Sequence, residues 1–148
     1  MLNVSHPKGL RLGAYLEALG HDFLGKLGLK NSELSLSLVT DRTIQALNRK
    51  WRAKNLPTDV LSFPSGGLPW GAPGPTPLGD VVISLDPARR QAKALGVPLE
   101  AELSRYLAHG LLHLLGHDHE RASDARRMSA AEDALLNAPG MVRLAGTC

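Results

Sequence analysis

The hydrophobic residues of the chain recur with two periods, which predict strands and helices in one mixed fold. Leu34, Leu36 and Leu38 alternate with polar residues, and this period of two is typical of a half-buried strand. Apolar residues at steps of three and four, from about Leu10 to Leu27, predict an amphipathic helix. The predicted strands cover residues 2–4, 34–38, 60–63 and 79–85. The predicted helices cover residues 10–27, 41–51, 87–95, 98–115 and 122–136.

These elements define the expected fold class. A small sheet of three or four strands packed with about five helices is an α+β fold, whose topology the pattern leaves open. The chain length of 148 residues predicts one domain, 1–148, because single domains usually have about 100–200 residues. The helix over 98–115 is apolar nearly all round, so we expect it in the core.

Capping residues and helix breakers predict where elements begin and end. Thr40 or Asp41 is expected to cap the second helix, and Asp86 to cap the third. Residues 65–77, which read SGGLPWGAPGPTP, are too rich in glycine and proline for the interior of a helix or sheet. They predict a long surface loop.

Composition places the chain among ordinary soluble globular proteins. Its 43% hydrophobic and 21% charged residues exclude a disordered or collagen-like chain. A net charge of +3 permits a polyanionic partner without requiring one. The single cysteine, Cys148, predicts no disulfide-linked partner. Because no apolar run is long enough for a signal peptide or a membrane span, we expect a cytoplasmic protein.

Three histidines form the pattern H-x-x-x-H-x-x-G-x-x-H near the end of the apolar helix. His109 and His113 are four residues apart, so their imidazoles lie about 40° apart around the helix axis and one turn apart along it. Gly116 is expected to turn the chain back in a left-handed conformation, and His119 follows three residues later. This arrangement predicts a zinc site with one open coordination position, as in catalytic zinc sites.

The residue after the first histidine limits which reactions the predicted zinc site can catalyse. In zinc proteases this position holds the glutamate that accepts a proton from the metal-bound water, but here it is Gly110. A peptidase is therefore a minor alternative, and close packing of another element or of the substrate would explain the glycine. Three neutral imidazoles leave the charge of the ion undiminished, which favours an anionic substrate such as a phosphodiester.

A second cluster combines positive charge with an aromatic ring. A solvated helix end would explain these charges as well as a functional role does. In a nucleic-acid contact, the cations would bind phosphates and the indole would stack on a base, which only unpaired strands offer. The stretch NRKWRAK surrounds Trp51 with four cations: Arg49, Lys50, Arg52 and Lys54.

The chain resembles the YbeY family in three blocks of sequence that occur in the family's order. The blocks are NRKWR with PTDVLSF, then LGDVVIS, and finally HGLLHLLGHDH. They span most of residues 48–119, and the histidine block is specific. Met128 and Glu132 in the last helix also look like the end of the family's sequences.

The resemblance implies a zinc-dependent endoribonuclease that hydrolyses single-stranded RNA. It implies a role in rRNA maturation, notably at the 3′ end of the small-subunit RNA, and in ribosome quality control. The family's ligands for one Zn²⁺ ion fall on His109, His113 and His119, and its functionally important arginine falls on Arg52. We therefore expect Arg52 and His113 to be catalytic, with the guanidinium clamping the phosphate.

The histidine block departs from the family pattern at one position. His117 stands where the family usually has tyrosine, so it competes with His119 as the third ligand. His119 is preferred because it keeps the spacing of the motif. His117 is then expected either beside the ligands or in contact with RNA. Asp118 is expected beside the ligands, where it orients a histidine or caps the turn.

Two other functions remain open. One is a ribosome-assembly factor in which zinc is structural and RNA binding is the whole activity. The other is a metzincin-like metallohydrolase acting on peptides. A small-subunit ribosomal protein is an expected partner, because a domain with a charge of +3 has limited affinity for RNA at physiological salt.

Overall fold

The computed structural model describes residues 2–4, 10–52, 59–65, 76–116 and 122–136 of the chain. A four-stranded sheet in the order β1-β2-β4-β3 forms its centre. Strands β1, β2 and β4 are parallel, whereas β3 is antiparallel to β4 and lies at the edge. The strands are β1 (Leu2–Val4), β2 (Ser32–Val39), β3 (Val60–Pro64) and β4 (Thr76–Ser84).

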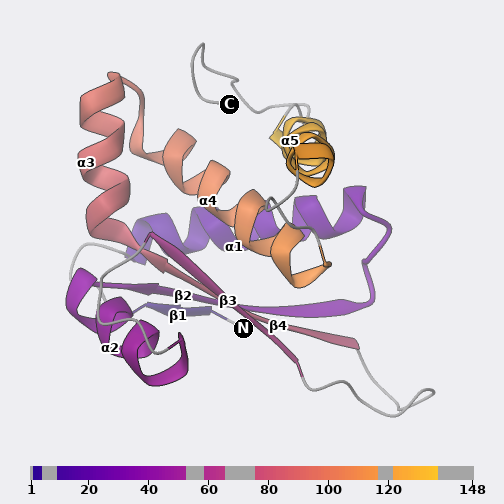
Figure 1. The fold of residues 1–148 in the computed structure, drawn as a ribbon, viewed down its shortest axis with the longest axis horizontal. Coiled ribbons are helices and arrows are strands. Elements are labelled where there is room, and N and C mark those ends of the chain that lie inside the picture. Colours follow the sequence, from indigo (N-terminus) through magenta and orange to yellow (C-terminus); the bar gives the residue numbers. More distant parts are fainter. Residues whose placement is uncertain (1, 5–9, 53–58, 66–75, 117–121, 137–148) are drawn as a thin grey trace.

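Five helices lie in the described part of the chain, which confirms the predicted α+β fold. They are α1 (Leu10–Lys26), α2 (Asp41–Arg52), α3 (Leu85–Leu95), α4 (Leu99–Leu114) and α5 (Ala122–Leu136). Helices α1 and α4 cover one face of the sheet and α2 the other, while α5 packs on α4 (Figure 1). No helix within the described ranges is both long and apolar enough to cross a membrane.

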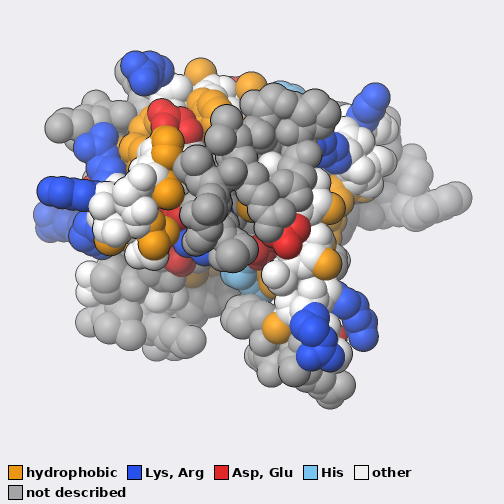
Figure 2. Space-filling view, turned by 90° about the horizontal axis from the view of Figure 1, so that it is seen from above, with side chains coloured by type: hydrophobic (Ala, Val, Ile, Leu, Met, Phe, Trp, Pro, Cys, Tyr) orange, Lys and Arg blue, Asp and Glu red, His pale blue; other side chains and the backbone are white. Residues whose placement is uncertain are grey.

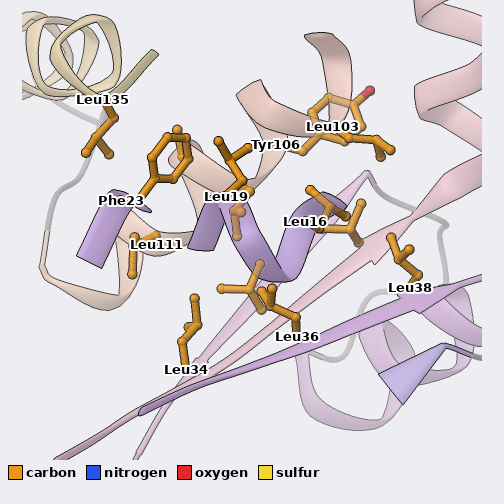
Figure 3. Packing of buried hydrophobic residues seen from close by; sticks show 14 of the residues in the cluster. Leu16, Leu19, Phe23, Leu34, Leu36, Leu38, Leu103, Tyr106, Leu111 and Leu135 are labelled. Atoms are coloured by element: carbon orange, nitrogen blue, oxygen red, sulfur yellow. The ribbon is translucent and has the colours of Figure 1, made fainter. Parts of the chain in front are cut away.

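The alternation of side chains along the central strands divides the core between the two faces. Val81 and Ile83 of β4 join the large cluster between the sheet, α1 and α4, whereas Val82 joins a small cluster under α2. Figure 3 shows the leucines of β2 pointing towards those of α1 and α4. The helix that carries the histidines is therefore held in the main core, as its apolar sequence predicts.

The start of α3 differs from the prediction. This helix begins at Leu85 with Ser84 as its N-cap residue, so the expectation that Asp86 caps it is wrong. The Asp86 carboxylate instead accepts a hydrogen bond of 3.0 Å from the backbone N–H of Asp41, the first residue of α2. Thr40 caps α2 as one of the two predicted candidates, through a 3.3 Å bond from the N–H of Thr43.

The glycine- and proline-rich loop is shorter at its C-terminal end than predicted. Strand β4 begins at Thr76, whose N–H donates to the carbonyl oxygen of Asn31, so residues 76–77 belong to the sheet. Pro77 is tolerated there because it pairs with Glu33 next to a register shift, close to the end of the strand. Residues 66–75 of the predicted loop lie outside the described residues.

Candidate functional site

The C-terminal half of α4 presents two histidines at the edge of the main core. The helix buries Leu107 and Leu111 completely, while the His109 side chain stays 35% exposed. Nε2 of His113 lies 3.1 Å from Nε2 of His109, with the rings inclined at 77°. The four-residue spacing thus brings two imidazole nitrogens to one point, as predicted.

The geometry of this pair fits a shared metal ion. Two nitrogens bound to a tetrahedral zinc at about 2.0–2.1 Å lie about 3.3 Å apart. The 3.1 Å between the two Nε2 atoms is close to that separation, so His109 and His113 need little movement to bind one ion. In the part of the chain that the structure describes, no group of three metal-binding side chains is gathered. The predicted third ligand, His119, lies outside the described residues, as do His117 and Asp118.

Glu132 of α5 contacts His109 at Nδ1, the ring nitrogen that does not face His113. Its Oε1 accepts a 2.6 Å hydrogen bond from Nδ1 of His109, and its side chain is 16% exposed. Met128, Glu132 and Leu135 recur at steps of four and three, so they share one face of α5. Met128 and Leu135 are buried in the main core, and this anchoring aims Glu132 at α4.

Gly110 lets α4 approach the sheet more closely than any other residue would. A Cβ at this position would lie 2.7 Å from Cγ1 of Val81 and 3.1 Å from Cγ2 of Val60. The hydroxyl of Ser62 on β3 also donates a 2.8 Å hydrogen bond to the Gly110 carbonyl oxygen. Close packing of another element is thus the reason for the glycine, and the protease glutamate has no room here.

After α4 the chain turns as the motif predicts. Gly116 has φ +93°, in the left-handed region that favours glycine. Its N–H bonds to the carbonyl oxygen of His113, which closes the last turn of the helix. The turn therefore begins at Leu115, two residues after the second histidine.

Further charges line the same helix one and two turns before the histidines. Arg105 donates a 2.9 Å bond to the fully buried Glu102. Burial lowers the pKa of Arg105, but the hydrogen bond and negative charge of Glu102 outweigh this effect and raise it; Glu132 adds to the rise. Burial, with the negative charges of Asp59 and Glu102, raises the pKa of Tyr106 to about 12. A permanent cation thus lies one helical turn before His109 on α4.

The predicted nucleic-acid contacts lie at the C-terminal end of α2. Trp51 is 62% exposed, Arg49 and Lys50 are exposed, and Nζ of Lys50 lies 5.1 Å from the indole centre. Arg52 is the last residue of α2, and Lys54 lies outside the described residues. This places cations next to a solvent-accessible aromatic face, the combination that single-strand binding uses.

Trp51 also borders a hollow of about 390 Å³ on the α2 face of the sheet. Its lining is mostly apolar and includes one exposed carboxylate; the residues are Ser37, Leu47, Trp51, Phe63, Asp80 and Val82. The histidines belong to the opposite face, and the edge strand β3 contributes to both, through Phe63 here and Ser62 there. Among the described residues on the face that Figure 2 shows, the lysine and arginine side chains lie mainly towards the periphery.

Comparison with known proteins shows the family of the chain. The family model described as Endoribonuclease YbeY matches residues 11–140. The chain belongs to the YbeY family. A Myxococcus xanthus protein named Endoribonuclease YbeY is 60% identical over 95% of the chain, which spans 48% of that relative. A relative of the same name from Anaeromyxobacter dehalogenans is 52% identical, with 95% and 72% of the two chains covered.

A solved structure supports the fold of this YbeY family member. The solution structure of TM1509 from Thermotoga maritima matches with a TM-score of 0.64 and 25% identity. The match covers 91% of this chain and 86% of that one. The arrangement of sheet and helices is therefore shared along nearly the whole chain.

Glu132 is the site residue that the sequence analysis did not assign. Only its resemblance to the end of YbeY family sequences singled it out, without a role. It lies 23 residues after His109 on another helix, so no local spacing rule connects the two. The useful signal was the apolar period of Met128 and Leu135, which already predicts that position 132 faces the core.

Proposed function

We propose that this chain is a zinc-dependent endoribonuclease that hydrolyses phosphodiester bonds of single-stranded RNA. We place it in the cytoplasm, in rRNA maturation at the 3′ end of the small-subunit RNA and in ribosome quality control. The observation that carries the proposal is the 3.1 Å approach of the Nε2 atoms of His109 and His113 on a helix held in the core. Membership of the YbeY family supports the reaction class.

The residues divide the proposed work between metal binding and phosphate binding. His109, His113 and His119 would hold one zinc ion. When bound, the ion would polarise a phosphodiester oxygen and activate a water molecule. Arg52 would clamp the phosphate, because its guanidinium matches two phosphate oxygens and offsets the charge that develops on them.

The α2 end would bind the RNA strand to one side of the cut. Arg49, Lys50 and Lys54 would contact phosphates, and Trp51 would stack on a base at the mouth of the hollow. A strand that reaches from this hollow to the histidines would cross the edge strand β3. A small-subunit ribosomal protein would add affinity that a charge of +3 cannot supply.

The proposal is tested on purified protein with single-stranded RNA. We expect His113→Ala to lose both zinc and cleavage, and Arg52→Glu to keep zinc but lose at least about 100-fold in cleavage rate. Arg42→Glu is the matched control, because it changes the same charge on an exposed residue at the other end of α2. It should cleave like the unmodified protein.

The same experiment distinguishes the rival functions. If both site variants process RNA like the unmodified protein, the catalytic assignment is wrong. Binding of RNA without turnover by the unmodified protein would favour an assembly factor. Cleavage of peptides that depends on His113 and not on Arg52 would favour a metallohydrolase. Zinc contents of His119→Ala and His117→Ala decide the third ligand.

A further inference from the structure

We propose that Glu132 is a positioning residue of the metal centre, which holds His109 in the tautomer that can bind the ion. This inference rests on the zinc site proposed above. Its basis is the 2.6 Å contact between Oε1 of Glu132 and Nδ1 of His109, made by a carboxylate that is only 16% exposed.

The hydrogen bond decides which ring nitrogen is free. A neutral imidazole carries one proton, and a carboxylate can only accept, so this proton lies on Nδ1 of His109. The lone pair of its Nε2 then points at Nε2 of His113, 3.1 Å away. Without the ion, His113 would donate its Nε2 proton into this gap; to bind the ion, His113 would carry this proton on Nδ1 instead, so that both Nε2 atoms are available as ligands.

The buried side chains beside Glu132 on α5 make its contact with His109 more than a chance surface pair. Met128 and Leu135 are each 2% exposed and fix the face of α5 that carries Glu132. The contact thus links the metal site to the main core. Replacement of Glu132 would free the His109 ring to rotate. Loss of a carboxylate that holds a ligand histidine in this way typically lowers metal affinity by about 10- to 100-fold.

Glu132 also changes the charge of the proposed site. Three neutral histidines leave a zinc ion with its full charge of +2. The Glu132 carboxylate, hydrogen-bonded to one ligand, would lower the total charge of the ion and its surroundings to +1. The site remains positive enough to attract a phosphodiester while it binds the metal more tightly.

The test measures zinc affinity of the full chain by competition with a chromophoric chelator. We expect Glu132→Ala to weaken zinc binding by about 10- to 100-fold and Glu132→Gln to weaken it less, because the amide oxygen still accepts from Nδ1. Asp124→Asn, on the same helix and paired with Arg127, is the matched control and should bind zinc normally. Affinity of Glu132→Ala within twofold of the unmodified protein overturns the inference.

A second measurement separates positioning from a merely structural contact. Nitrogen-15 NMR of the metal-free protein should report the Nδ1–H tautomer for His109, a mixture of tautomers in Glu132→Ala, and a smaller change in Glu132→Gln, whose amide oxygen can still accept from Nδ1. An unchanged tautomer in both variants overturns the inference even if stability falls. If the unmodified protein itself does not bind zinc, the proposed function fails as well, so the two failures are distinguishable.

Discussion

The two faces of the sheet are packed to different extents. The face covered by α1 and α4 has a large leucine-rich core (Figure 3), and the partly exposed histidines of α4 lie at its edge. The face under α2 buries a small cluster and leaves a hollow of about 390 Å³ beside the exposed Trp51. Metal ligation needs side chains held within about 0.5 Å, whereas base stacking tolerates looser placement. The difference in packing matches the precision that each of the two proposed contacts requires.

The largest effect on stability is expected when one fully buried residue from each face is replaced by alanine. We predict that Leu107→Ala lowers the free energy of unfolding by about 4 kcal/mol, because α4 is enclosed and cannot collapse into the cavity. Ile44→Ala should cost less, about 2–3 kcal/mol, because its small cluster adjoins the hollow and can relax. Urea unfolding followed by circular dichroism measures both. Equal costs would mean that the α2 face is packed as rigidly as the other.

An intermediate effect on stability is expected from a substitution at the point where α4 contacts the sheet. Gly110→Ala should lower the free energy of unfolding by about 1–2 kcal/mol, since the new methyl meets Val81 at 2.7 Å and overpacking outweighs the gain in helix propensity. Gly20→Ala in α1 is the control, because its Cβ would lie 3.6 Å from Leu36, an ordinary contact.

The control should move in the opposite direction. Because space is available, Gly20→Ala should raise the free energy of unfolding by up to about 1 kcal/mol. The midpoint of thermal unfolding should rise with it. If Gly110→Ala is stabilising as well, α4 does not need its close approach to β3 and β4. Zinc content measured on the same samples shows whether the shift of α4 reaches His109 and His113.

The sequence predicts those parts of the molecule that local geometry decides. Period-two leucines in β2 and the apolar length of α4 specify their elements without tertiary information. Helix geometry alone puts His109 and His113 on one face, and glycine alone predicts the left-handed turn at Gly116. These features depend only on residues within a few positions of one another.

The parts that the sequence does not predict depend on how distant elements meet. Asp86 looks like the cap of its own helix, but the fold brings the start of α2 to its carboxylate. Glu132 has no local signal of its role, because the packing of α5 against α4 makes its contact with His109. The hollow beside Trp51 likewise arises only when α2 is laid across the sheet.

The smallest expected effect on the fold is at Trp51, on the looser face. Trp51→Ala should change the free energy of unfolding by no more than about 0.5 kcal/mol, because the side chain is 62% exposed. It should weaken binding of single-stranded RNA by about 1–3 kcal/mol, the usual value of one base stacked on an aromatic ring. Trp51→Phe, which keeps a ring, should recover most of this binding in a fluorescence anisotropy titration. A loss of stability without a loss of RNA affinity would make Trp51 part of the core of this face, and the contrast between a packed face and a binding face would then no longer hold.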